Sequence, residues 1–220
     1  MLLMLISGLW KNRNSQLWEN KASSASDIFQ RCITWLEEFH QASKPVAAAA
    51  QLPVSKKWSP ESTVELTLNV DGAFLPQLPK GGLGKVLRNT SGEVQAAFQT
   101  AVQFVSSPMH AELLAIQSGL QLVRVLQFES VCIVSDCLLA VQDINNGSPI
   151  LTEYGPLIED IGFILQQLHP IKITYAPRAC NKLAHRLASL AYESEQSVSW
   201  LHTIPDCIQD IVQQEIPPLI

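Results

Sequence analysis

The sequence shows none of three patterns that would identify a cellular environment: paired cysteines, a membrane-spanning segment and a signal peptide. Its five cysteines are odd in number and include no Cys-x-x-Cys pair. This argues against a disulfide framework or a zinc site and favours a reducing compartment, nucleus or cytoplasm. The opening MLLMLISGLW is apolar but too short to span a bilayer, and it has neither the basic start nor the cleavage site of a signal peptide. We therefore expect no membrane partner.

Positive charge is also scarce. The 15 Lys and Arg residues are outnumbered by 20 Asp and Glu residues, which gives a net charge of −5. This excludes a protein that binds nucleic acid through a broadly basic surface, so any nucleic-acid site must be a local patch or must use metal ions. With 47% hydrophobic residues, the 220-residue chain can fill a core. We expect a monomer with one globular domain and an extension, or two small units.

Four segments differ in their residue pattern. Residues 1–42 predict helices, because apolar residues recur at helical spacing, and Ser26 or Asp27 is a candidate cap. Residues 43–63 are rich in Ala, Pro and Ser and aperiodic, which is typical of a linker. Residues 64–193 predict a compact α/β domain, and residues 194–220 an amphipathic or irregular C-terminal tail.

The α/β segment begins with an alternation of Leu66, Leu68 and Val70 with polar residues, which predicts a strand with one buried face. Asn-Thr-Ser-Gly at 89–92 predicts a hairpin, and Pro108 suits the first turn of a long helix. The expected strands cover 64–73, 83–89, 93–102, 130–135 and 171–176, and the expected helices 108–126, 137–147, 153–168 and 180–194. This order implies a mixed sheet with helices on its faces.

Three acidic residues occupy matched places in this layout. Asp71 lies on the first strand, Glu112 early in the long helix, and Asp136 at the end of the fourth strand. The first and fourth strands can be neighbours in such a sheet, which would bring the three carboxylates together. Clustered carboxylates are costly unless a hard divalent cation holds them. Each also has an ordinary explanation: Asp136 as a helix cap, Glu112 as a partner of the helix dipole, and Asp71 as a turn residue.

Several stretches together carry a family resemblance: NVDGAF, GGLGKVLRNTSGEV, HAELLAIQSGLQLV, SDCLLAVQDIN and YAPRACNKLAHRLA. Over residues 64–193 the chain resembles the type 1 ribonuclease H domain, in the form attached to the reverse transcriptases of plant non-LTR retrotransposons. The resemblance implies a ribonuclease H-like α/β fold with a five-stranded mixed sheet flanked by helices. It also implies a hydrolase that cleaves the RNA strand of RNA–DNA hybrids with Mg²⁺, or with Mn²⁺ as an alternative.

The resemblance assigns roles to individual residues. It implies that Asp71, Glu112 and Asp136 are catalytic metal ligands, with Gly72 leaving room for a nucleic-acid backbone. His185 stands where the family has a fourth acid. We expect it to be a catalytic-site residue that binds metal or phosphate without supplying negative charge.

A basic strip is expected beside this site. Between residues 172 and 192 the chain has cations and no acids, namely Lys172, Arg178, Lys182 and Arg186. We expect nucleic-acid contacts from Arg178, Asn181, Lys182 and Arg186, although an ordinary solvated helix face is an alternative explanation.

Two functions of different classes remain open at this point. One is a metal-dependent endonuclease acting on RNA–DNA hybrids. The other is a non-catalytic nucleic-acid-binding or interaction module left from a retroelement, which the histidine at position 185 and the net negative charge favour. A remnant with neither function is a weaker third possibility.

Overall fold

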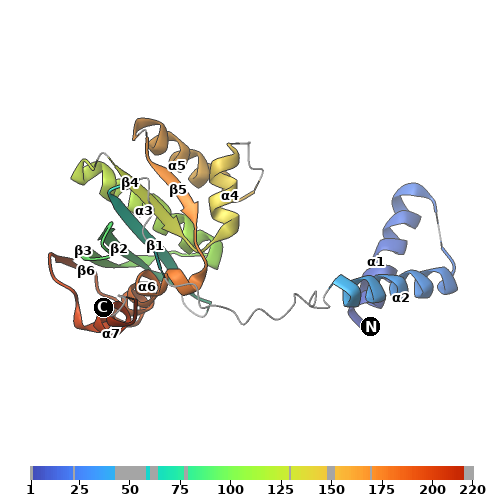
Figure 1. Cartoon of the computed structure of the whole chain (residues 1–220). Coiled ribbons are helices and arrows are strands. Elements are labelled where there is room, and N and C mark those ends of the chain that lie inside the picture. Colours follow the sequence, from blue (N-terminus) through green and yellow to red (C-terminus); the bar gives the residue numbers. More distant parts are fainter. Residues whose placement is uncertain are drawn as a thin grey trace. The chain divides into compact units, whose positions relative to one another are not determined.

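A computed structural model describes residues 2–21, 23–42, 58–59, 64–76, 79–128, 130–147, 152–168 and 170–215. The chain divides into two compact units, Met1–Val54 and Ser55–Ile220 (Figure 1). Of the expected linker at 43–63, only residues 58 and 59 fall within the described part. Within the described residues, no helix combines the length and the apolarity needed to cross a membrane.

The smaller unit consists of two packed helices, α1 (Leu2–Glu19) and α2 (Ala25–Ala42). Ile28 and Cys32 are buried against α1, where a Cβ on Gly8 would lie 2.5 Å from Cys32 Sγ. Helices were predicted here, but the cap is Ser24 rather than Ser26 or Asp27. The backbone N–H of Asp27 donates to Ser24 Oγ over 3.2 Å, and the Ser24 hydroxyl donates to Asp27 Oδ2 over 2.7 Å.

The larger unit is built on one sheet with the strand order β5-β4-β1-β2-β3-β6. Its strands are β1 (Leu66–Leu75), β2 (Lys80–Asn89), β3 (Val94–Gln103), β4 (Val131–Ser135), β5 (Lys172–Tyr175) and β6 (Val198–Leu201). β1, β2, β3 and β6 are joined antiparallel, whereas β4 runs parallel to both β1 and β5. The predicted mixed α/β architecture is confirmed.

Helices cover both faces of this sheet (Figure 1). They are α3 (Pro108–Leu126), α4 (Leu138–Asn146), α5 (Gly155–Gln167), α6 (Lys182–Ser194) and α7 (Asp206–Glu215), with a short 3₁₀ helix η1 (Arg178–Cys180). Leu87 of β2 belongs to the larger hydrophobic core, with α3, α4 and α5. Its neighbour Val86 belongs to the smaller core, with α6 and α7. Successive strand residues point to opposite faces, so the two cores lie on opposite sides of the sheet.

β1 is buried on both faces, whereas the sequence alternation predicted one buried face. The polar residues Thr67, Asn69 and Asp71 are at most 3% exposed. The reason is α6, which packs over this face of the sheet. Gly84 of β2 permits the close approach, since a Cβ there would overlap the backbone carbonyl of Ala184 in α6.

The sheet has six strands rather than the predicted five. β6 lies within the expected tail at 194–220 and pairs antiparallel with β3, with Ala97 opposite Trp200. α7, from the same segment, buries Ile208 in the smaller core. None of the four residues of β6 is fully buried, whereas the equally short β5 buries Ile173, so β6 has a weaker apolar pattern in the sequence, which explains the error.

Candidate active site

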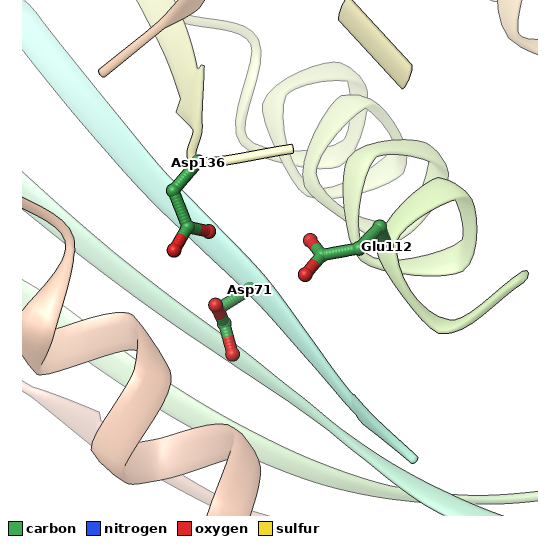
Figure 2. Close-up of side chains that lie close together, drawn as sticks. All are labelled: Asp71, Glu112 and Asp136. Carbon is green, nitrogen blue, oxygen red and sulfur yellow. The ribbon is translucent and has the colours of Figure 1, made fainter. Parts of the chain in front are cut away.

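Three carboxylates from separate elements converge at one place (Figure 2). Asp71 lies on β1, Glu112 lies early in α3, and Asp136 directly follows β4. Oxygen atoms of the three side chains lie within 4.8 Å of one another. β1 and β4 pair in parallel with Asn69 opposite Val134, so Asp71 and Asp136 emerge side by side two residues later. The predicted convergence of the three side chains is confirmed.

Gly72 brings α3 close enough to β1 for Glu112 to join the two aspartates. A Cβ on Gly72 would overlap the backbone carbonyl of Ala111 and would lie 2.6 Å from the backbone nitrogen of Glu112. The space beside this glycine is therefore occupied by α3. The close approach at this glycine is between two parts of the same chain, and the expected approach of a nucleic-acid backbone to Gly72 stays a prediction.

The electrostatics of the cluster favour a bound cation. Burial raises the pKa of Glu112 to about 9, and the nearby charges of Asp71 and Asp136 act in the same direction. Burial also raises the pKa of Asp136, with the charge of Asp71 adding to the effect and a hydrogen bond from Asn181 opposing it. Three ionised carboxylates at this separation are therefore unstable without positive charge between them.

The donor set fits a hard divalent cation. Glu112 Oε2 is buried and has no hydrogen-bond partner among the described residues, which leaves a ligand atom unsatisfied. Such cations bind carboxylate oxygens at about 2.0–2.6 Å, so oxygens up to about 5 Å apart can share one ion. The three side chains meet this condition.

Asn181 is fully buried and holds Asp136 in place. Its Nδ2 donates to Asp136 Oδ1 over 3.1 Å and to the backbone carbonyl of Val70 over 2.9 Å. Its Oδ1 accepts from Asn69 Nδ2 over 3.1 Å. Both amide hydrogens are engaged inside the protein, so the expected contact between Asn181 and nucleic acid stays a prediction without support from this geometry. Sequence reasoning missed Asn69, although its position two residues before Asp71 places it on the same face of β1.

His185 of α6 lies beside the carboxylate cluster. Its Nδ1 is 3.1 Å from Asp71 Oδ2, and its Nε2 is 2.8 Å from a guanidinium nitrogen of Arg178. The same guanidinium nitrogen lies 3.3 Å from His185 Nδ1, so the imidazole contacts both the carboxylate of Asp71 and the guanidinium of Arg178. His185 thus lies next to Asp71, although it is not among the three residues whose ligand atoms lie within 4.8 Å of one another.

The expected basic strip is only partly assembled. Arg178, Lys182 and Arg186 are exposed on η1 and α6, and Lys182 and Arg186 are four residues apart on one helix face. Lys172, in contrast, lies opposite Cys132 in the register of β5 with β4. Cys132 is three residues before Ser135, which is at the active-site end of β4. At about 3.3 Å per residue, it lies roughly 10 Å from that end. Lys172 is therefore not part of the strip.

Comparisons with known proteins agree with this geometry. The sequence profile of the family described as reverse transcriptase-like matches residues 69–191, more than half of the chain. No curated protein matches the chain.

Solved ribonucleases H share the fold at low sequence identity. Ribonuclease H1 of the archaeon Halobacterium salinarum is 19% identical, with a TM-score of 0.54 over 60% of this chain and 98% of that one. The N-terminal ribonuclease H domain of a Mycobacterium tuberculosis protein is 22% identical, with a TM-score of 0.53 over 60% and 95%. A compost-derived ribonuclease H1, in complex with an RNA/DNA hybrid, is 16% identical, with a TM-score of 0.54 over 59% and 98%.

Proposed function

Because the chain belongs to the reverse transcriptase-like family and has the ribonuclease H fold, we propose that it is a metal-dependent endonuclease. Its substrate would be the RNA strand of RNA–DNA hybrids, and its metal Mg²⁺, with Mn²⁺ as an alternative. The observation that carries this proposal is the meeting of Asp71, Glu112 and Asp136 within 4.8 Å. Two divalent ions held there would supply an activated water and stabilise the leaving oxygen of a phosphodiester.

The residues of the chain have separate tasks in this proposal. Asp71, Glu112 and Asp136 would hold the ions, and the buried amide of Asn181 keeps Asp136 oriented through its 3.1 Å hydrogen bond. The imidazole of His185, which is hydrogen-bonded to Asp71, restricts the rotation of that carboxylate.

Substrate binding is assigned to exposed cations beside the site. Arg178, Lys182 and Arg186 can contact phosphate oxygens, which would position the nucleic acid without reading its sequence. The fold neighbour solved with an RNA/DNA hybrid supports this choice of substrate. An RNA strand differs from a DNA strand by its 2′-hydroxyls, and we expect these and the shape of the duplex to be recognised.

A second candidate is a non-catalytic nucleic-acid-binding module. The observation that favours it is the contact of the His185 imidazole with Asp71, at a place where a fourth carboxylate would have supplied charge for metal binding. Such a module would bind hybrids in a salt-dependent way but would not turn them over.

The test uses the full chain with three substrates: an RNA–DNA hybrid, duplex DNA and single-stranded RNA, each with and without Mg²⁺. We expect internal cleavage of the RNA strand of the hybrid only, and only with metal. Failure to cleave the hybrid in either Mg²⁺ or Mn²⁺ would reject the endonuclease, and binding without turnover would select the second candidate.

The matched variants are Asp71→Asn at the site and Asp160→Asn on the exposed surface of α5. Asp71→Asn should abolish cleavage while hybrid binding stays equal or becomes stronger, because one negative charge fewer eases the approach of phosphate. Asp160→Asn removes the same charge elsewhere and should leave the rate unchanged. Cleavage retained in Asp71→Asn would refute its assignment as a ligand.

A further inference from the structure

We propose that Trp58 is a positioning residue for Asp136 and acts through a buried relay of two asparagines, Asn69 and Asn181. This inference rests on the proposed function, in which Asp136 is a metal ligand whose orientation affects metal binding. Trp58 lies upstream of residues 69–191, the part of the chain that matches the family. In this proposal, a residue outside the matched region is therefore part of the site.

The relay is a continuous series of hydrogen bonds. The indole N–H of Trp58 donates to Asn69 Oδ1 over 3.1 Å, and Asn69 Nδ2 donates to Asn181 Oδ1 over 3.1 Å. Asn181 Nδ2 then donates to Asp136 Oδ1 over 3.1 Å. Both asparagines have no exposed surface, so water does not compete for these bonds.

The orientation of the Asn69 amide depends on the donor at the start of the relay, and that of Asn181 depends on Asn69 together with the carbonyl of Val70, which accepts from its Nδ2 over 2.9 Å. An indole N–H can only donate, so Asn69 must turn its oxygen toward Trp58 and its NH₂ group toward Asn181. Asn181 must then present its oxygen to Asn69 and its NH₂ group to Asp136. Without the indole donor, Asn69 loses the partner of its oxygen and can rotate by half a turn. Asn181 Oδ1 would then face the oxygen of Asn69 instead of an N–H donor.

Trp58 is itself held by residues on the α7 side of the sheet. The guanidinium carbon of Arg88 lies 4.2 Å from the centre of the Trp58 ring, within the range of a cation–π contact. Arg88 is 2% exposed and pairs with Glu215 of α7 over 2.6 Å. Gly92 of the β2–β3 hairpin lies against the same ring, since a Cβ there would be 3.0 Å from Trp58 Cζ3. These contacts keep the indole N–H directed at Asn69.

The consequence for the site is a fixed orientation of the Asp136 carboxylate. Removing a group that orients a metal ligand directly lowers metal affinity by about 10–100-fold. Trp58 acts two hydrogen bonds further away, so we expect a smaller loss, about 3–10-fold, when its N–H is removed. Binding of the hybrid should not change, because no relay residue is an exposed cation.

The test compares Trp58→Phe with Trp200→Phe. Both remove an indole N–H on the same side of the sheet, but Trp200 lies on β6 beside the smaller core and outside the relay. Three properties of the metal-free protein are measured: the ¹⁵N resonance of the Asn181 side-chain amide, the ¹³C resonance of the Asp136 carboxyl, and the calorimetric affinity for Mn²⁺. Activity is measured as kcat against Mn²⁺ concentration and as KM for the hybrid.

We expect Trp58→Phe to shift both resonances, to weaken Mn²⁺ binding about 3–10-fold, and to lower kcat at limiting Mn²⁺ with KM unchanged. Trp200→Phe should change none of these. If both resonances and the Mn²⁺ affinity are unaltered in a folded Trp58→Phe protein, the relay is refuted. Should that variant not fold, Asn69→Ala breaks the relay one step nearer to Asp136 and decides the question by the same measurements.

Failure of the proposed function would look different. If the relay exists, the Trp58→Phe variant will show the two resonance shifts even when the wild-type protein does not cleave hybrids. Cleavage by the wild type together with unshifted resonances in the variant would refute the relay alone.

Discussion

The imidazole of His185 lies between a carboxylate and a guanidinium, with its Nδ1 3.1 Å from Asp71 Oδ2 and its Nε2 2.8 Å from Arg178. This arrangement places an imidazole where a fourth carboxylate would increase the negative charge of the site. The cluster therefore has a formal charge of −3 when its three carboxylates are ionised, against +4 for two divalent ions. The second ion should be held weakly until substrate phosphate adds negative charge.

Replacing His185 with aspartate should strengthen metal binding. We expect His185→Asp to lower the Mg²⁺ concentration needed for half-maximal cleavage and to raise the rate, because Mg²⁺ strongly prefers oxygen ligands. Rates across a Mg²⁺ titration measure this. His202→Asp makes the same substitution in the exposed turn after β6 and should have no effect. An unaltered Mg²⁺ dependence in His185→Asp would place this residue outside the metal shell.

Much of the site was predictable because it depends on the order of the strands. Asp71 and Asp136 meet because β1 and β4 are parallel neighbours, and this pairing follows from the sequence of elements. The role of Asn181 was not predictable, since its partners Asn69 and Asp136 lie 112 and 45 residues away in the chain. Hydrogen bonds over such separations leave no periodic pattern.

Some helices and strands were predicted with the correct bounds, and others were missed. The helix expected at 108–126 begins and ends where predicted, because Pro108 marks its first turn and its apolar residues repeat at helical spacing. Ser107 accepts a hydrogen bond from the backbone of His110 and completes the cap. β6 was missed, since its four residues are half exposed and can be recognised only through their pairing with β3.

The contact between Gly72 and α3 predicts a large effect of adding one methyl group. Gly72→Ala forces a Cβ into the backbone carbonyl of Ala111, so α3 must shift away from β1 and move Glu112 with it. We expect a loss of stability of about 1–3 kcal/mol, together with weaker metal binding, measured by urea unfolding and calorimetry.

The matched control is Gly162→Ala in α5, where a Cβ meets nothing within 4 Å. This substitution should stabilise the protein by up to about 1 kcal/mol, because alanine is the better helix former. Equal stability of the two alanine variants would show that the backbone of Ala111 in α3 does not lie against Gly72 of β1.

The buried pair of Arg88 and Glu215 predicts strong energetic coupling between β2 and α7. Arg88 is 2% exposed and the side chain of Glu215 is 8% exposed, with 2.6 Å between Nη1 and Oε2. Arg88→Met or Glu215→Leu alone should lower the free energy of unfolding by about 3–5 kcal/mol, since each leaves an unpaired buried charge. The double variant should recover most of this loss. Additive losses in urea unfolding of the three variants would contradict the coupling.

Lys85 is a buried cation with little compensating charge. It lies on β2 with 6% of its surface exposed, and its ammonium group donates to Ser118 Oγ over 2.7 Å. Burial lowers the pKa of Lys85 from 10.5 to about 8. Below pH 8 both the folded and the unfolded protein carry this charge, and the folded protein bears the cost of burying it.

Stability should therefore rise with pH through the Lys85 window. Between pH 8 and 10.5 the unfolded chain keeps a proton that the folded protein has released, so the Lys85 contribution to the free energy of unfolding increases by about 3 kcal/mol. Lys85→Met should stabilise the protein at pH 7 by up to that amount, and the advantage should shrink toward pH 10.5. Urea unfolding across this range measures both curves, with Lys172→Met on the exposed end of β5 as the control. A constant difference between wild type and Lys85→Met would mean that Lys85 is not desolvated in the folded protein.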